Sequence, residues 1–320
     1  MSVTKMSLIL LGISLIFLQA ESRCRHVKKK GSLRADCFNQ GLKRIPEDLI
    51  KDIEILDARH NTIPQLVNDS IKWYPFLKEI YLQTTGLLII DHTTFSSSTQ
   101  LEILDLSNNL IRDLPQNIFY LPKLRKLYLD HNEITDTSFK SLNVTSPIEY
   151  LDLSVNKLTR VPQLSLFHVV LLNLTGNPIK TIKVEELATM CSLKELIVNE
   201  DIFNDSGCSC HIIEKLLSKW NIKVTVTTPL NCQGQNGCTN VDMLFDHTLA
   251  LREKCETKLL AQKKIRQREA KMIYWSIAVG LAVFMLALVL SFWFQNRKSG
   301  TYETKEVMPT SDYMEELSDM

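Results

Sequence analysis

Apolar residues recur along the middle of the chain with a spacing that fits neither a helical face nor a simple alternating strand. In LEILDLSNNLIRDL (101–114), apolar residues stand at positions one, four and six of the frame, an asparagine at nine and an isoleucine at eleven. The same frame begins again at residues 53, 77, 124, 148, 169 and 193, so the period is 21 to 24 residues. Seven copies at nearly one period predict a repeat architecture.

Each copy predicts a short strand followed by a turn. The fourth and sixth positions are expected to face one side of the strand and to alternate with polar residues on the other. An asparagine at the ninth position can bond the backbone of the turn and form a ladder with its neighbours in the stack. Thr85 and Asp201 take this place in the second and seventh copies, and we expect less regular turns there. The asparagines are Asn61, Asn109, Asn132, Asn156 and Asn177.

Frame and period together resemble the leucine-rich repeat, LxxLxLxxNxL. The resemblance implies an α/β fold, a curved leucine-rich repeat solenoid with a parallel sheet on its concave side, because one repeat cannot bury its own apolar face. We expect about seven repeats over residues 53–205. A cysteine cap over 23–52 would cover the first repeat, and a second cysteine cap over 206–257 would cover the last.

Both caps are marked by cysteines. CFNQGLKRIPEDL (37–49) resembles the cap that precedes extracellular leucine-rich repeats, and CSCHIIEKLLSKW (208–220) resembles the cap that follows them. The resemblance implies the disulfides Cys24–Cys37, Cys208–Cys232 and Cys210–Cys255. Cys191 and Cys238 remain, and their pairing would complete four bridges from the eight cysteines, although the sequence alone leaves the connectivity open.

A zinc site at Cys208, Cys210 and His211 is the competing interpretation of the C-terminal cap. Disulfides are favoured over metal there, because secreted cysteines oxidise.

Two long apolar segments predict the compartment. Residues 1–22 read as a secretory signal peptide. Residues 272–294 are uncharged with aromatic residues at both ends, and at about 1.5 Å per residue a helix of this length spans a hydrocarbon core of about 30 Å. The chain is thus expected to be a single-pass type I protein of the plasma membrane with its N-terminus extracellular and a cytoplasmic tail over 295–320. A basic stalk, 258–271, disagrees with the positive-inside tendency, but long domains translocate largely regardless of flanking charge. The stalk could continue the membrane helix and dock on a partner, or could meet acidic glycans.

Modification motifs agree with an exposed ectodomain. Four asparagines begin N-glycosylation sequons: Asn68, Asn143, Asn173 and Asn204. The tail is too short for a signalling domain; it holds the candidate phosphorylation sites Tyr302 and Tyr313, and its last three residues loosely match a PDZ ligand.

Function is expected on the concave sheet, where positions three, five and seven of each repeat face outward. No motif for a hydrolase, metalloprotease, P-loop or dinucleotide site is present, so we expect neither an enzyme nor a cofactor. Asp105, Ser107, Asp152 and Ser154 follow the repeat consensus and are expected to be scaffold. Departures from the consensus are the predicted ligand-binding residues, since tyrosine and arginine are enriched at binding hot spots, although tyrosines also simply suit strands. They are Arg59, Tyr81, Gln83, Tyr128, Asp130 and Tyr150.

These patterns favour a cell-surface recognition protein that binds a protein ligand or co-receptor, in immune recognition or in cell adhesion and guidance. The alternative is a non-catalytic partner subunit that stabilises another membrane protein. Either reading allows a homo- or heterodimer. A net charge near zero gives no reason to expect nucleic acid as a partner.

Overall fold

The structure is a computed structural model that describes residues 24–29, 31–67, 70–140, 142, 144–162, 166–199, 215–226 and 241–299. The chain divides into two compact units, Met1–Leu259 and Leu260–Met320. The repeats and caps lie in the first unit and the apolar end of the last helix in the second, and each unit is described by itself.

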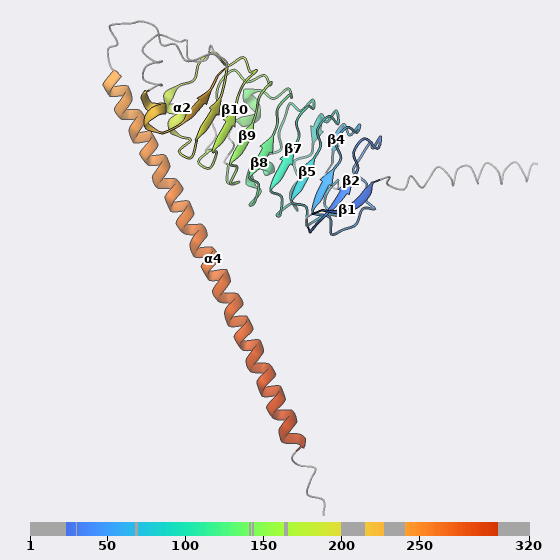
Figure 1. Cartoon of the computed structure of the whole chain (residues 1–320). Coiled ribbons are helices and arrows are strands. Elements are labelled where there is room, and N and C mark those ends of the chain that lie inside the picture. Colours follow the sequence, from blue (N-terminus) through green and yellow to red (C-terminus); the bar gives the residue numbers. More distant parts are fainter. Residues whose placement is uncertain are drawn as a thin grey trace, which may run out of the picture. The chain divides into compact units, whose positions relative to one another are not determined.

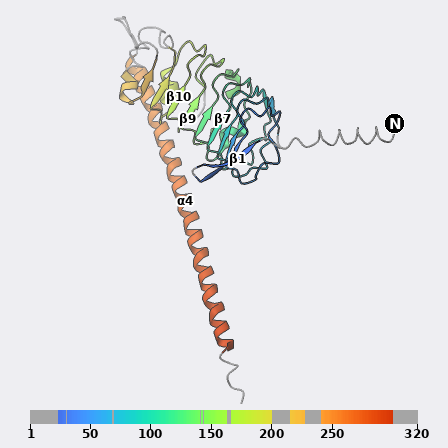
Figure 2. The same ribbon diagram turned by 45° about the vertical axis from the view of Figure 1, so that its right-hand side comes forward.

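Ten short strands form one sheet along one side of the first unit, side by side in chain order (Figures 1 and 2). The first two strands form an antiparallel hairpin, and from the second strand onward all neighbours are parallel. Seven of the strands come from the seven predicted copies, which confirms the repeat solenoid. The strands in sheet order are β1 (Arg25–Lys29), β2 (Ser32–Asp36), β3 (Ile55–Asp57), β5 (Glu79–Tyr81), β7 (Ile103–Asp105), β8 (Lys126–Tyr128), β9 (Tyr150–Asp152), β10 (Leu171–Asn173), β11 (Glu195–Ile197) and β12 (Lys223–Thr225).

The core lies behind this sheet and is built from the fourth and sixth positions of the frame. Leu104 and Leu106 of the third copy are completely buried, and the corresponding residues of the other copies are at most 1% exposed. Alternation along a strand puts both positions on the same face, so each copy contributes two aliphatic side chains to a shared core.

Short elements return the chain on the opposite side of this core. Phe119 and Phe139 are buried there with ring centroids 6.2 Å apart. The elements are the parallel pair β4 (Gln65–Leu66) and β6 (Ile89–Ile90), the 3-10 turns η1 (Gln116–Tyr120) and η2 (Asp136–Phe139), and α2 (Val184–Ala188).

The predicted asparagine ladder is present. Asn109 is buried; its Nδ2 donates to the carbonyl oxygens of Leu82 and Leu106 at 2.9 Å each, and its Oδ1 accepts the backbone N–H groups of Thr85 and Leu87 at 3.0 Å each. Asn61, Asn132, Asn156 and Asn177 make the corresponding donations to the preceding and the same repeat. Each asparagine therefore ties its own turn to the turn before it.

The Thr85 turn is more regular than expected. The residue before each ladder position is left-handed, and Thr84 has φ 56° against 54° for Asn108 and 53° for His131. The Thr85 hydroxyl replaces the asparagine amide only within its own repeat, donating to the Leu82 carbonyl oxygen at 3.1 Å. The turn shape is thus kept without an asparagine, because the backbone and Asn109 hold it. Asp201 lies outside the described residues.

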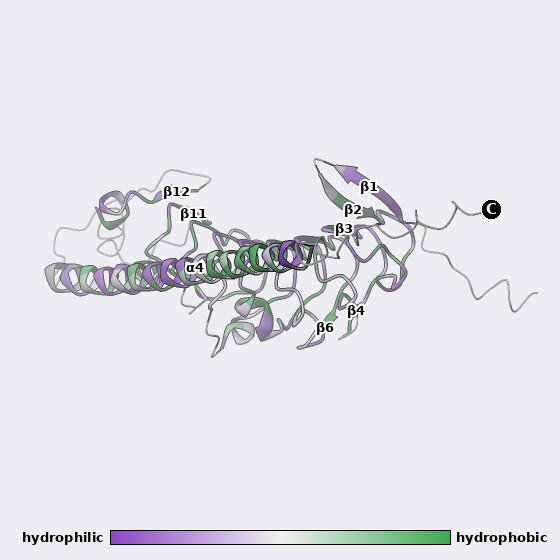
Figure 3. Ribbon diagram, turned by 90° about the horizontal axis from the view of Figure 1, so that it is seen from below, coloured by the Kyte–Doolittle hydropathy of each residue, from purple (hydrophilic) through white to green (hydrophobic). Residues whose placement is uncertain are grey.

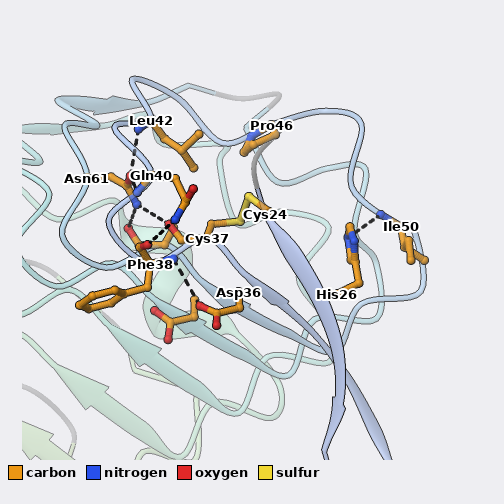
Figure 4. Close-up of a disulfide and its surroundings, with 12 residues drawn as sticks. Cys24, His26, Asp36, Cys37, Phe38, Gln40, Leu42, Pro46, Ile50 and Asn61 are labelled. Atoms are coloured by element: carbon orange, nitrogen blue, oxygen red, sulfur yellow. Dashed lines mark hydrogen bonds between the residues drawn. A yellow bond between two sulfur atoms is a disulfide. The ribbon is translucent and has the colours of Figure 1, made fainter. Parts of the chain in front are cut away.

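The N-terminal cap is closed as predicted by Cys24–Cys37 (Figure 4). Cys37 is fully buried at the end of β2, and its carbonyl oxygen accepts Asn61 Nδ2 at 2.9 Å. The disulfide therefore fastens the hairpin strand β1 to the first turn of the asparagine ladder.

The C-terminal cap contradicts the expected pairing. Cys255 is bonded to Cys191, so the predicted bridges Cys210–Cys255 and Cys191–Cys238 are both wrong. The reason is the helix α4 (Val241–Ser299): its Arg252 donates to the carbonyl oxygens of Met190 at 3.1 Å and Cys191 at 2.7 Å. Arg252 thus brings the next turn of α4, which carries Cys255, against the last repeat. The predicted bridge Cys208–Cys232 and the zinc alternative fall outside the described residues.

α4 continues through the predicted stalk into the apolar segment. Its stretch from Asp246 to Arg297 contains a strongly apolar segment that is not buried, and Figure 3 shows a hydrophobic stretch along α4. Within the described part of the chain, α4 is the one helix long and apolar enough to cross a membrane, which is consistent with single-pass membrane placement. The predicted signal peptide and tail lie outside the described residues.

Candidate functional site

Sheet register arranges the outward side chains of the repeats in rows. The fifth positions of successive strands are direct neighbours: Asp57 pairs with Tyr81, Tyr81 with Asp105, Asp105 with Tyr128 and Tyr128 with Asp152. Carboxylates and tyrosines therefore alternate across the middle of the concave face. The row continues with Asn173 and Ile197.

At the N-terminal end of the row, a carboxylate is paired within the chain. Asp57 is fully buried, forms an ion pair with Arg34, and accepts Arg59 Nε at 2.8 Å and Nη2 at 2.7 Å. Burial alone would raise the pKa of Asp57, but the hydrogen bonds and charges of Arg59 and Arg34 outweigh it and lower that pKa.

Aromatic rings complete the environment of Arg59. Its guanidinium carbon lies 5.5 Å from the ring centroid of Phe38 and 5.9 Å from that of Tyr81. Phe38 in turn meets the ring of His60 edge-on, with centroids 5.1 Å apart. Arg59 is thus a cation held between a carboxylate and two aromatic faces.

The centre of the row holds a carboxylate without such a cation. Asp105 accepts the backbone and hydroxyl of Ser107 at 3.1 and 2.7 Å and the side-chain amide of Gln83. Burial, with a contribution from Asp130, raises the pKa of Asp105. The other amide atom, Gln83 Oε1, is buried and has no hydrogen-bond partner.

Two tyrosines from adjacent strands lie together beyond Asp105. The rings of Tyr128 and Tyr150 have centroids 4.8 Å apart at an angle of 40°. Burial, and then Asp152 and Tyr128, raise the pKa of Tyr150 to about 12. Burial also raises the pKa of Tyr128, and the carboxylates of Asp105, Asp152 and Asp130 add to that shift. In the sheet register Tyr128 stands between Asp105 and Asp152, so a carboxylate lies on either side of it.

The structure brings the six predicted binding residues onto one face but gives them different roles. Arg59 and Gln83 are engaged by neighbouring aspartates, and Tyr81 donates its hydroxyl to Glu79 Oε2 at 2.8 Å. Asp130 meets His131 Nδ1 at 3.0 Å. The expected scaffold pairs behave as such, since Asp152 accepts the backbone N–H of Ser154 just as Asp105 accepts that of Ser107.

Sequence reasoning missed Arg34 and Phe38. They lie in β2 and just after it, ahead of the first copy of the leucine frame. In the sheet register, Arg34 stands beside the third position of the first copy, so the cap strand behaves as an additional repeat. Asn39, two residues after Cys37, is left-handed. Asparagine tolerates that conformation, so this residue is the sequence signal that could have revealed the additional repeat.

Of the predicted glycosylation sites, only Asn173 lies within the described residues. Its Nδ2 donates to Asp152 at 3.1 Å, and its Oδ1 accepts the hydroxyl of Thr175 at 2.9 Å. Asn68, Asn143 and Asn204, like Tyr302 and Tyr313, fall outside the described residues. Among the residues the structure describes, no group of three His, Cys, Asp or Glu side chains is placed to hold a metal ion.

Known proteins resemble this chain over its repeats. Residues 75–134 match the leucine rich repeat family model. Leucine-rich repeat-containing protein 3B of Homo sapiens is 33% identical over 90 residues, 28% of this chain and 35% of that protein. Leucine-rich repeat-containing G-protein coupled receptor 5 of Homo sapiens is 34% identical over 83 residues, 26% of this chain and 9% of the receptor.

Toll-like receptor 2 type-1 of Gallus gallus is 33% identical over 79 residues, 25% of this chain and 10% of the receptor. The aligned parts span between 9% and 35% of these relatives' own lengths, so the similarity concerns the repeats. The comparisons find leucine-rich repeats in this chain and agree with the resemblance drawn from frame and period.

Proposed function

We propose that this chain is a non-enzymatic recognition protein of the cell surface that binds a protein ligand or co-receptor with its concave sheet. The observation that carries the proposal is the fifth-position row. Parallel register gathers Tyr81, Tyr128 and, from the third position, Tyr150 onto one outward face that the repeats themselves do not need for their core. Partly exposed tyrosines on a rigid sheet have the character of protein-binding hot spots.

The proposed placement is the plasma membrane, with the repeats outside. It is supported by the predicted signal peptide and by the two disulfides Cys24–Cys37 and Cys191–Cys255, because disulfides persist in oxidising compartments. Epitope tags at the two ends of the mature chain test it on intact cells. Staining of an N-terminal tag alone supports the placement, and a C-terminal tag that stains without permeabilisation overturns it.

The binding face is tested by replacing tyrosines on the concave sheet and, as a control, a tyrosine outside it. Proximity labelling of living cells compares the intact chain with Tyr81→Ala/Tyr128→Ala and with Tyr120→Ala. Tyr120 ends η1 away from the sheet and is 44% exposed, so its loss changes a tyrosine without touching the concave face. Partners labelled by the intact chain and by Tyr120→Ala, but lost from the double variant, support the proposal.

A quantitative version measures the affinity of a recovered partner. Loss of two hot-spot tyrosines should weaken binding by about 2 kcal/mol or more. Unchanged binding by the double variant at equal surface expression would move the site to the convex side, the caps or the stalk. The identities of the labelled partners would also distinguish a role in immune recognition from a role in cell adhesion.

A further inference from the structure

The concave face already binds a cation that the chain itself supplies near its N-terminal end. Arg59 is held by the carboxylate of Asp57 and lies between the rings of Phe38 and Tyr81. This arrangement shows which chemistry the alternating row accepts: a guanidinium in contact with an acidic oxygen and an aromatic face.

The same chemistry is repeated further along the sheet without a cation. We use the name tyrosine–carboxylate socket for Asp105, Tyr128, Asp130, Tyr150 and Asp152, which come from β7, β8 and β9 and from the turn after β8 (Figure 1). In the sheet register Tyr128 stands between Asp105 and Asp152, and Asp130 follows two residues after Tyr128, so the carboxylates flank the ring pair of Tyr128 and Tyr150.

The described residues supply no lysine or arginine ion pair to this socket. Asp105 and Asp152 accept hydrogen bonds from neutral donors, and Asp130 lies beside His131. The charge of Arg59 acts on Asp105 from a distance, but Arg59 forms its ion pair with Asp57. Lys126 stands beside Tyr150 in the sheet register, but it forms no ion pair with the three carboxylates. The corresponding carboxylate at the other end of the row, Asp57, has two arginines.

The socket also has more hydrogen-bond acceptors than donors. Gln83 donates to Asp105, which leaves its own Oε1 buried without a donor. A ligand that brings several N–H groups therefore complements this excess of acceptors. Guanidinium has five N–H donors and a flat face that stacks on aromatic rings, whereas ammonium has three donors on a compact charge.

We propose that the tyrosine–carboxylate socket binds a basic side chain of the protein partner, and that arginine fills it best. The proposal rests on the proposed function, because it names the chemistry that the concave face recognises. It divides the face into an N-terminal part whose cation is built in and a central part whose cation comes from the partner.

The test uses the full-length chain in lipid nanodiscs and a random peptide library displayed on phage. Peptides are selected on the intact chain and depleted on Tyr128→Ala/Tyr150→Ala. We expect the surviving peptides to carry a shared arginine or lysine. Replacing a shared arginine by citrulline, which keeps the shape and removes the charge, should weaken binding about ten-fold or more, as a desolvated cation–π contact with a charged hydrogen bond predicts.

A milder variant guards against misfolding. Asp130→Asn removes one charge at constant shape, and Asp113→Asn does the same at an exposed position outside the sheet. The arginine peptide should bind Asp130→Asn more weakly and Asp113→Asn unchanged, while the citrulline peptide should not distinguish them.

The outcomes separate the two proposals. Tyrosine-dependent peptides that lack a basic residue, or that tolerate citrulline, overturn the socket and leave the concave face as a binding site. Recovery of no tyrosine-dependent peptide from the intact chain overturns both.

Discussion

The buried asparagine ladder yields a stability prediction that two adjacent asparagines can test. Asn109→Ala removes the acceptor of two backbone donors, the N–H groups of Thr85 and Leu87. The three carbonyl oxygens that Asn109 serves keep other partners. Leu82 retains the Thr85 hydroxyl, Leu106 retains Asn132, and Ser107 retains the backbone N–H of Thr84. The loss is therefore concentrated on two buried N–H groups.

The magnitude follows from that count. An unsatisfied buried donor costs about 1–3 kcal/mol, so Asn109→Ala should lower the free energy of unfolding by about 2–6 kcal/mol. Asn108, its neighbour, is exposed and left-handed, with φ 54°. Asn108→Gly removes a side chain of the same kind and relieves the backbone, so its effect should stay within about 1 kcal/mol.

Pulse proteolysis in a urea gradient, applied to the full-length chain in detergent, compares the two variants with the parent. The midpoint should fall clearly for Asn109→Ala and little for Asn108→Gly. Equal midpoints for the two variants would refute the ladder as a source of stability. A shift for Asn109→Ala alone would also show that the Thr85 turn depends on the next repeat.

Three further predictions follow from single contacts. A non-reducing peptide map should recover Cys191 joined to Cys255, and Cys255→Ser should reduce surface expression, since losing a native bridge costs about 2–5 kcal/mol. Because the pKa of Tyr150 is raised to about 12, its neutral form stabilises the fold below about pH 10, and this stabilisation is lost as the pH rises towards 12. Tyr150→Phe should flatten this part of the dependence of stability on pH. Urea midpoints measured between pH 9 and 12 test it. Gly176→Ala should lower stability more than Gly86→Ala: both glycines are left-handed, but a Cβ at Gly176 meets a neighbouring side chain at 2.9 Å, whereas Gly86 has open space.

Much of the fold could be predicted because each repeat obeys a local rule. The leucines at the fourth and sixth positions define the buried face of a strand, and Asn109 with its counterparts defines the turn, so strand positions and stacking order follow from one period. The Thr85 turn shows the limit of that rule. Its shape is held by a bond from the next repeat, which the residues of the turn itself do not reveal.

The C-terminal cap and the binding face depend on contacts between distant segments. Pairing of Cys255 is decided by Arg252, whose targets are backbone carbonyl oxygens around residue 190, and carbonyls leave no signature in a sequence. Arg59 was predicted to bind ligand because arginine is unusual at its position. Its hydrogen bonds to Asp57, two residues earlier, are local, but its contacts with the rings of Phe38 and Tyr81 depend on the sheet register.

The sequon at Asn173 leads to a final prediction about the socket. Asn173 Nδ2, the atom that would carry a glycan, donates to Asp152 at 3.1 Å, so a glycan would begin at the edge of the tyrosine–carboxylate socket. Occupancy of the socket and glycosylation of Asn173 should exclude each other on one molecule.

Mass spectrometry of two pools of the same preparation tests this exclusion. Chains captured by the arginine peptide should lack the Asn173 glycan, and any glycosylated chains should remain in the unbound pool. Asn173→Gln removes the sequon and one hydrogen bond to Asp152, and it should leave peptide binding equal or stronger. Captured chains that carry a glycan at Asn173 would show that the partner's cation binds elsewhere, because a bulky hydrated glycan and a desolvated guanidinium cannot share the rim formed by Asp152.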